Sequence, residues 1–596
     1  MSDLMTGVNT RSSHTVARVL HLAWSIADRP VRLALILGTV TVLLSSMLTG
    51  LAPVALAALI DAVAPDTASS GHWAWTGLIV AYTGCLGTAR VFAELRASIY
   101  GRALQRLNRS LAERTFAHSL SLPLRYHHSH SLGALSQAVT SGLIGNRMIV
   151  YHVGHTLAPL LIETSIVAFV LAQFHSTSLI ALFLCTATLY AIAFTRGSRA
   201  LQAPAHGITS TSIAANCVLT DSIVNYEAVK SFNAEPAMCE RYQHILTENE
   251  CNWTQWYRRR AVLGLIVACI FASSMSLSLI WAARGVERGS LSVGEFALVN
   301  AYMLRLAVPL ELLGVALKDM SEGAAYVKKL LDILDTDVEP ETGRRDVGHR
   351  YNGSLELREV SFGYLKDLAV LNNISFSVPA GSTVAIVGPS GSGKSSLAKL
   401  LLRLYEPTSG TILLDGKDIA DLSLHELRHV IAIVPQDTVL LNDTIAKNIA
   451  LGAPCDQCDI ELAARIAGME STILSWPEGY ATMVGERGLK LSGGERQRIA
   501  IARAIVRKPC ILIFDEATSS LDAQTERSIL RELTQVTRHI TTLVIAHRLT
   551  TVVHARTILV LVNGQLAEQG SHAELLARGG CYASLWNAQY GVAAPA

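Results

Sequence analysis

Charged residues are scarce in this sequence. They make up 16% of its 596 residues, against roughly 25% in ordinary soluble domains, and 50% of the residues are hydrophobic. This balance excludes a disordered or coiled-coil chain and indicates that part of the protein faces lipid. The length exceeds what one hydrophobic core supports, at roughly 100 to 200 residues per domain, so we expect at least two domains.

The sequence also lacks a strong net charge and a cysteine framework. Its net charge is +2, which provides no basic field for nucleic acid, so no nucleic-acid partner is expected. The ten cysteines are scattered, and several lie in apolar stretches. This pattern is typical of reduced packing residues rather than of a secreted disulfide scaffold.

Two short clusters contain metal-ligating residue types. His127–His130 holds three histidines, but a contact with the second domain is the favoured interpretation over metal sensing. Cys455 and Cys458 have C-x-x-C spacing without a second pair, so a redox or zinc role is the less favoured interpretation.

Long uncharged stretches occur only before residue 315. A bilayer core of about 30 Å requires about 20 apolar residues per helix. The sequence predicts six spans, at residues 33–60, 73–95, 155–174, 177–195, 261–283 and 294–314. The last span contains Arg305 and Glu311, and we retain it because a cytosolic domain after it requires an even number. Spans two to five are expected to continue as helices beyond the membrane.

The positive residues predict the orientation. Four arginines lie between residues 11 and 32, and residues 90–147 carry eight arginines against two acids, whereas residues 61–73 contain no Lys or Arg. Because cytoplasmic flanks retain Lys and Arg, we expect the N-terminus and the C-terminal domain in the cytosol. No organellar transit pattern is visible, so a bacterial inner membrane is expected, and a mitochondrial origin is the weaker alternative.

Polar residues inside the spans are candidates for a substrate cavity, because charges are costly in a bilayer. The candidates are Glu163, Arg305 and Glu311, together with Asn300 near the centre of the last span. A structural role is equally open. In that case Glu163 bridges helices, and Arg305 and Glu311 mark a helix that leaves the membrane.

A soluble domain follows the spans. We assign residues 1–325 to the membrane domain, 326–352 to a linker and 353–590 to the second domain. An apolar strand at 382–387 runs directly into Gly388–Ser395, a G-x-x-x-x-G-K-[ST] pattern, and a predicted helix follows it. In that context backbone N–H groups and the helix N-terminus cradle phosphates.

The phosphate-binding candidates are Gly388, Pro389, Ser390, Gly391, Ser392, Gly393, Lys394, Ser395 and Ser396. Lys394 is expected to reach the β and γ phosphates, and the Ser395 hydroxyl is expected to ligate Mg²⁺. A second apolar strand at 510–514 ends in Asp515 and Glu516, at the sheet edge where ligands bind. Asp515 is placed to hold the metal, and Glu516 to polarise an attacking water as a general base.

A second anion site is predicted at the start of another helix. Ser492, Gly493 and Gly494 open the strongly helical stretch after Leu491, where free N–H groups attract phosphate. One chain therefore carries two phosphate sites.

These residues resemble the motifs of an ATP-binding cassette, and the whole chain resembles a half-size ABC exporter. The matching motifs are Tyr364, Gly388–Ser395, Gln436, Leu491–Gln497 with Gln497 at its end, Ile511–Asp515 with Glu516, Ser519–Asp522, and His547. The resemblance implies adenine stacking by Tyr364, Mg²⁺ coordination and a catalytic role for Gln436, catalysis by His547 with Glu516, and ATP contacts by Gln497 and Asp522. It implies an all-α six-helix transmembrane domain followed by an α/β P-loop cassette domain.

The family also implies a head-to-tail dimer, in which Ser492 of one subunit completes the ATP site of the other. Glu516 and the Leu491–Gln497 motif are both intact, so a homodimer is expected. ATP and Mg²⁺ would drive alternating access in the bilayer and export a solute from the cytosol. A non-transporting, nucleotide-gated regulator is the remote alternative.

Within this family the chain resembles the Atm1-type group. The matching stretches are Asn225–Phe232, Leu291–Gly294, Pro309–Gly314 and Val484–Ser492. The resemblance implies a glutathione-related or metal-conjugate substrate. The stretch 200–211 contains no Lys or Arg, although basic residues are common at such positions in the group, so a small peptide or a hydrophobic natural product is the alternative cargo.

Overall fold

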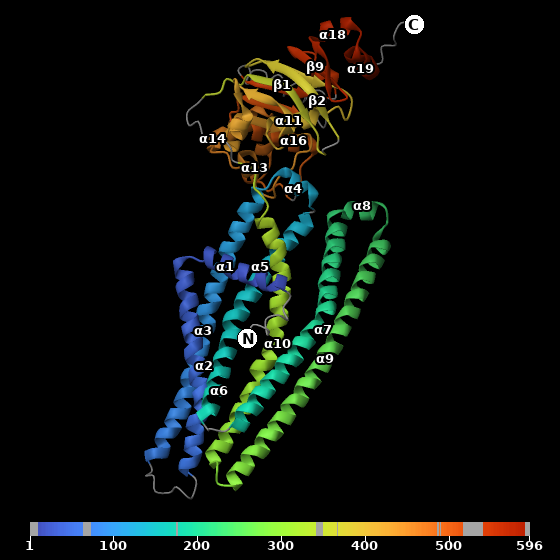
Figure 1. Ribbon diagram of the computed structural model, residues 1–596. Helices are drawn as coiled ribbons and strands as arrows, with labels where there is room; N and C mark the ends of the chain where they lie inside the picture. Colours follow the sequence, from blue (N-terminus) through green and yellow to red (C-terminus); the bar gives the residue numbers. More distant parts are fainter. Residues whose placement is uncertain are drawn as a thin grey trace. The chain divides into compact units, whose positions relative to one another are not determined.

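The computed structural model describes residues 10–63, 73–130, 132–173, 177–340, 350–365, 368–485, 488, 490–515, 540–546 and 548–590. The chain divides into two compact units, Met1–Leu122 with Tyr126–Val338, and Glu339–Ala596 with Pro123–Arg125. Among the described residues the first unit is helical and the second combines strands and helices (Figure 1). The predicted fold class is confirmed.

The first unit is a succession of long helices (Figure 1). They are α1 (Thr10–Ile26), α2 (Arg29–Val63), α3 (Trp73–Leu120), α4 (Leu124–Ser129), α5 (Leu132–His152), the π-helix η2 (Val153–Leu157), α6 (Ala158–Gln173), α7 (Thr177–Val224), α8 (Tyr226–Ser231), α9 (Glu235–Glu287) and α10 (Val293–Leu334). Helices α7 and α9 have 48 and 53 residues, more than twice the roughly 20 that cross a bilayer. These lengths favour the prediction that helices continue beyond the spans, which stays a prediction.

Five stretches of the described residues are long and apolar enough to cross a membrane. They are Arg29–Val63, Trp75–Leu120, Gly133–Val170, Ala181–Val224 and Glu235–Glu287. The sixth predicted span, 294–314, lies in α10, which is not among the five. It stays a prediction, because it depends on its position before the second unit rather than on hydropathy.

Small residues set how closely the helices pack. A Cβ atom added at Gly50 of α2 would lie 2.9 Å from Ile166 of α6, and one at Gly142 of α5 would lie 2.5 Å from Leu330 of α10. Only glycine permits these approaches, as is common between membrane helices. The end of α2 is also tied to the start of α10, because Asp61 accepts hydrogen bonds from the Ser292 hydroxyl at 2.6 Å and the Gly294 N–H at 2.7 Å.

The second unit contains two sheets. Strands β1 (Leu355–Phe362), β2 (Leu371–Val378), β4 (Ser409–Leu414) and β5 (Lys417–Asp418) form an antiparallel sheet in the order β2-β1-β4-β5. Strands β3 (Thr383–Val387), β6 (Ile431–Val434), β7 (Ile511–Asp515), β8 (Thr541–Ile545), β9 (Thr557–Val562) and β10 (Gln565–Gly570) form the order β10-β9-β3-β8-β7-β6. Only β10 runs antiparallel to its neighbour in this second sheet. Residues 384–387 of β3 and 511–514 of β7 are apolar and buried, as expected for strands covered on both faces.

Helices complete the second unit. They are α11 (Lys394–Leu401), α12 (Leu424–Val430), α13 (Ile445–Ala450), α14 (Gln457–Ile466), α15 (Glu470–Ser475), α16 (Gly493–Ile505), α18 (His572–Arg578) and α19 (Cys581–Tyr590). The boundary between the two units, after Val338, lies inside the range 326–352 predicted as linker. Residues 326–334 of that range belong to α10 instead, because Val327, Leu330 and Leu331 are buried against the helical unit.

Candidate functional site

The phosphate-binding loop connects β3 to α11 through backbone conformations that require glycine. Gly388, Gly391 and Gly393 have φ angles of 155°, 82° and 97°, in the region that disfavours other residues. A Cβ atom at Gly388 would lie 2.0 Å from the Leu561 carbonyl oxygen, and one at Gly393 would lie 2.5 Å from Leu371. The glycines therefore allow the loop to pass close to neighbouring strands and turn into the helix.

Two polar side chains of this loop, Lys394 and Ser392, are buried. The Lys394 ammonium donates to the carbonyl oxygens of Gly388 and Pro389, both at 2.9 Å. The Ser392 hydroxyl is buried without a hydrogen-bond partner. A buried polar atom of this kind is costly unless a ligand satisfies it, so the loop fits phosphate oxygens.

Two oxygen donors suited to Mg²⁺ meet at the loop. Asp515 ends β7, and its Oδ1 accepts a hydrogen bond from the Ser395 hydroxyl at 3.1 Å. Mg²⁺ prefers such oxygen ligands and usually completes its shell with water and phosphate. Gln436 follows β6 by two residues, and the register pairs Val434 with Phe514, so this side chain also belongs to the same sheet edge.

Tyr364 lies beside the phosphate loop. Its hydroxyl is 3.0 Å from the Ser396 hydroxyl. Its ring packs against Phe362 and Tyr405, at centroid distances of 4.9 and 5.2 Å, and is 37% exposed. The partly exposed ring is available to stack on a base.

The predicted second anion site is a helix N-terminus in the structure. Ser492 caps α16, and its backbone N–H donates to Glu495 at 2.7 Å in a capping box. Gly493 and Gly494 form the first turn, and Gln497 is buried one turn later. The exposed Ser492 and the two glycines leave this end open to an anion.

Three predicted site residues lie outside the described residues: Glu516, Asp522 and His547. The strands that lead to two of them are described. Asp515 of β7 pairs with Ile545 of β8, and these strands continue in sequence to Glu516 and, after Ala546, to His547.

A large cavity lies in the helical unit, between α7, α9 and α10. Its volume is about 560 Å³, within the range of small-molecule sites. Its lining residues are Phe194, Leu201, Gln202, Ala205, His206, Thr209, Trp256, Arg260, Leu263, Gly264, Val267, Val315, Lys318, Ser321, Glu322, Ala325 and Tyr326. We call this the central pocket.

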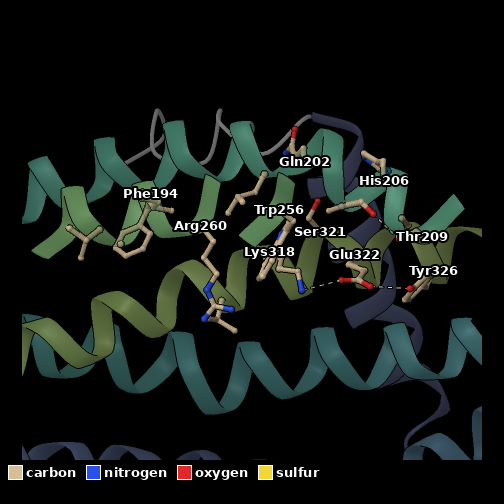
Figure 2. Close-up of a pocket in the computed structure, with 17 residues that line it drawn as sticks. Phe194, Gln202, His206, Thr209, Trp256, Arg260, Lys318, Ser321, Glu322 and Tyr326 are labelled. Atoms are coloured by element: carbon tan, nitrogen blue, oxygen red, sulfur yellow. Dashed lines mark hydrogen bonds and ion pairs between the residues drawn. The ribbon is translucent and has the colours of Figure 1, made fainter. Parts of the chain in front are cut away.

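The polar groups of the central pocket gather around Trp256 (Figure 2). The Arg260 guanidinium and the Lys318 ammonium each lie 5.1 Å from the centroid of its ring. Glu322 approaches Lys318 at 3.6 Å and accepts a hydrogen bond from Tyr326 at 2.9 Å. The Trp256 Nε1 atom is buried without a hydrogen-bond partner, so it remains as a donor for a ligand.

The sequence-based cavity candidates lie elsewhere. Glu163 and Arg305 line a separate cavity of about 20 Å³, and Arg305 donates to the Thr49 carbonyl oxygen. Asn300 lines neither of these two cavities, and the Glu311 side chain lies outside the described part. The central pocket was not predicted from the sequence, because its polar residues lie on helix extensions outside the predicted spans. The pairs Trp256/Arg260 and Lys318/Glu322, each four residues apart on a helix extension, were an available signal.

The two short clusters do not form a metal centre among the described residues, where no group of three or more His, Cys, Asp or Glu side chains could hold a metal. The His130 ring stacks on Tyr126 at a centroid distance of 4.2 Å, and His127 lies 3.1 Å from the Ser119 carbonyl oxygen. Cys455 and Cys458 are free thiols.

Comparison with known proteins defines the class. Residues 371–519 match the ABC transporter family, and residues 35–310 match the ABC transporter transmembrane region. The chain is therefore an ABC transporter that couples ATP hydrolysis to transport across a membrane.

The chain belongs more narrowly to the Atm1-type ABC exporters. It is 37% identical to the ATM1-type heavy metal exporter of Novosphingobium aromaticivorans, over 96% of this chain and 95% of that protein. It is 35% identical to the mitochondrial iron-sulfur clusters transporter atm1 of Neurospora crassa, over 89% of this chain and 76% of that protein. A solved bacterial Atm1-family ABC exporter with ATP bound is similar at a TM-score of 0.86 and 35% identity, over 96% of this chain and 100% of that one.

Proposed function

We propose that this exporter moves a glutathione-related solute, free or as a metal conjugate, out of the cytosol. The observation that carries the proposal is the mixed charge of the central pocket, where Arg260 and Lys318 lie against Trp256 and Glu322 lies 3.6 Å from Lys318. A glutathione-type peptide carries carboxylates and an ammonium group, which complement both signs. The names of the bacterial and fungal relatives, a heavy metal exporter and an iron-sulfur clusters transporter, support the same class of cargo.

A second cargo class has support from the same pocket. Phe194, Leu201, Leu263, Val267 and Val315 give much of it an apolar wall, which favours a small peptide or a hydrophobic natural product. Glu163 and Arg305 are assigned to the structural role, because a cavity of about 20 Å³ has room for about one water molecule.

The test is the ATPase activity of the purified chain in lipid nanodiscs, with oxidised glutathione, glutathione–metal adducts and a panel of small peptides. We expect glutathione species to stimulate hydrolysis. Lys318→Gln should raise their half-maximal concentration about tenfold, the effect of one lost charge-assisted hydrogen bond. Lys328→Gln, exposed on the same helix and outside the pocket, should not change it. Stimulation by peptides alone would identify the second cargo class instead.

At the cassette we propose that ATP binds with Mg²⁺. Lys394 and the glycine loop would hold the phosphates, Ser395, Asp515 and Gln436 would hold the metal, and Tyr364 would stack on the base. The metal ion, when bound, neutralises charge that develops on the phosphates. Glu516 and His547 would orient and polarise the attacking water.

We further propose a homodimer with two composite ATP sites in a bacterial plasma membrane. Support comes from the two phosphate sites of one chain, the loop before α11 and the N-terminus of α16 (Ser492, Gly493, Gly494). Gln497 and Asp522 are the further members of the composite site. The four arginines that precede the first predicted span and the bacterial relative support this membrane, with the N-terminus and the cassette in the cytosol.

A further inference from the structure

A second large cavity lies between α7 and α9, on residues other than those of the central pocket except for Leu263. Its volume is about 850 Å³. Three arginines line it: Arg196 from α7, and Arg258 and Arg259 from α9. We call it the arginine groove.

Apart from Gln255, which lies beside the arginines in sequence, the other lining residues of the arginine groove are apolar or glycine. The arginines and the large apolar side chains are ordered along the groove. On α7, Leu189 and Ile192 precede Arg196, and on α9, Val262 and Ile266 follow the arginines. The two helices run antiparallel along each other (Figure 1), with Arg259 donating to the Ala200 carbonyl oxygen of α7 at 2.6 Å. All three guanidinium groups therefore belong to one end of the groove and the apolar side chains to the other.

The positions of the arginines and of the apolar side chains along the groove correspond to different depths in the membrane. The predicted spans end at residue 195 and begin again at residue 261, so the arginines fall at the cytosolic boundary and the apolar end falls inside the hydrocarbon layer. Arg196 and Arg258 are exposed, and none of the three arginines forms an ion pair with a carboxylate in the part of the chain described. Unpaired cations at this boundary attract the anionic lipids of the cytoplasmic leaflet.

The floor of the groove is kept narrow by a glycine. A Cβ atom at Gly197 would lie 2.5 Å from Leu263 of α9, so glycine lets the two helices approach at the depth of Arg196.

We propose that the arginine groove binds an anionic phospholipid of the cytoplasmic leaflet. Its phosphate would lie between Arg196 and Arg258, since guanidinium groups bind phosphate oxygens in a bidentate geometry. Its acyl chain would lie along Ile192, Val262 and Ile266. In a bilayer the phosphate groups lie at the level of the arginines, and the hydrocarbon lies at the level of the apolar side chains. A protein partner would instead need carboxylates to neutralise the three arginines. This inference does not depend on the identity of the cargo.

The first test is native mass spectrometry of the full chain in detergent, titrated with phosphatidylglycerol or with phosphatidylcholine of the same acyl chains. We expect preferential retention of phosphatidylglycerol. The double variant Arg196→Gln/Arg258→Gln should weaken it about 25-fold, since each basic residue near an anionic headgroup contributes about fivefold. Arg259 is left in place because it contacts Ala200. Arg102→Gln, an exposed arginine of α3, is the matched control and should bind normally.

Equal retention of the two lipids, or normal retention by the double variant, would overturn the proposal. Inorganic phosphate at millimolar concentration should not displace the lipid. Displacement would show that the arginines select a free anion instead.

A photo-cross-linking residue in place of Val262, which is 54% exposed, provides an independent readout with all arginines present. Illumination in native membranes should give a phospholipid adduct. A cross-link to a second copy of the chain without a lipid adduct, or no adduct at all, contradicts the proposal.

Discussion

Two polar side chains of the phosphate loop, Lys394 and Ser392, are buried. Burying a polar group is unfavourable unless a ligand or a neighbouring carbonyl oxygen forms a hydrogen bond with it. Lys394 is 5% exposed, and its charge is satisfied by two carbonyl oxygens of its own loop. Ser392 is 4% exposed and has no such partner. An unsatisfied buried hydroxyl is costly, so Ser392 supports the proposal that this loop binds phosphate.

Asp415 is a second residue whose environment makes a testable prediction. Its carboxylate accepts hydrogen bonds from the N–H groups of Asn352, Gly353 and Ser354, at 2.6, 3.2 and 2.7 Å. Burial acts to raise the pKa of this carboxyl, but the hydrogen bonds from Ser354, Gly353 and Asn352 outweigh it and hold the pKa below its usual value. The stabilisation is therefore present above the pKa of the unfolded chain and is lost as pH falls through the lower folded pKa.

We expect Asp415→Asn to lower the unfolding temperature at pH 7, because an amide cannot accept all of these N–H groups. The loss is about 1–2 kcal/mol for charge-assisted hydrogen bonds, and the difference from the unmodified chain should shrink as the pH falls below about 4. Thermal unfolding of the full chain across this pH range measures it. Asp421→Asn, also in the cassette and exposed, should change little. A difference that is independent of pH would contradict the assignment.

At the scale of elements, helices α13 and α16 hold the segment that follows Gln436. Asn448 of α13 is fully buried and binds the backbone of Leu441 through both side-chain atoms, each at 2.9 Å. Arg503 of α16 donates to the Asn448 carbonyl oxygen at 2.8 Å and to the Val439 carbonyl oxygen at 3.2 Å. Burial lowers the pKa of Arg503, and the backbone oxygens stabilise its charge. Residues 439–444 are thereby fixed without forming a regular element.

Asn448→Ala should release residues 439–444, because it leaves backbone groups of Leu441 without partners. We expect amide hydrogen exchange in that segment to accelerate by at least about tenfold, the equivalent of losing roughly 1–3 kcal/mol from unsatisfied buried groups. Exchange in strand β3 should be unaffected. Gln457→Ala at the exposed start of α14 is the control, and similar acceleration in that variant would indicate general loosening of the helices rather than loss of this contact.

At the scale of the whole molecule, the chain joins a membrane unit with a cargo-sized cavity to an ATP-binding unit. The central pocket and the phosphate loop lie in different units, so transport requires that ATP favour one conformation of the membrane unit over another. A ligand that bound both conformations equally would drive no transport.

Glu516→Gln should bind ATP, accumulate as a nucleotide-bound dimer and lose turnover, because the amide cannot act as a general base. We expect steady-state hydrolysis to fall at least about 100-fold, the lower range for a positioned base. Chemical cross-linking with and without ATP measures the dimer, and a phosphate-release assay measures turnover. Hydrolysis near the unmodified rate would exclude Glu516 as the base, and ATP-independent cross-linking would exclude nucleotide-driven closure.

The sequence by itself determined the class of protein, the helices and the phosphate loop. These features depend on local order: uncharged runs of span length, a strand that runs into a glycine-rich turn, and a helix that starts at Lys394. Each of these features is formed by residues that are consecutive in the sequence, so each can be predicted without knowing the tertiary structure. The end of α10 was missed, because the linker was placed from residue 326, whereas the buried Leu330 and Leu331 continue the helix to Leu334.

Only the tertiary structure decided which residues meet. Trp256, Lys318 and His206 lie on three different helices and share one cavity, whereas Glu163 and Arg305, which a bilayer makes expensive, share a space about the size of a water molecule. Packing of α7, α9 and α10 forms the first cavity, and packing of α2, α6 and α10 forms the second. The named side chains that share a cavity are fifty or more residues apart in sequence, and no local pattern predicts how close they lie in space.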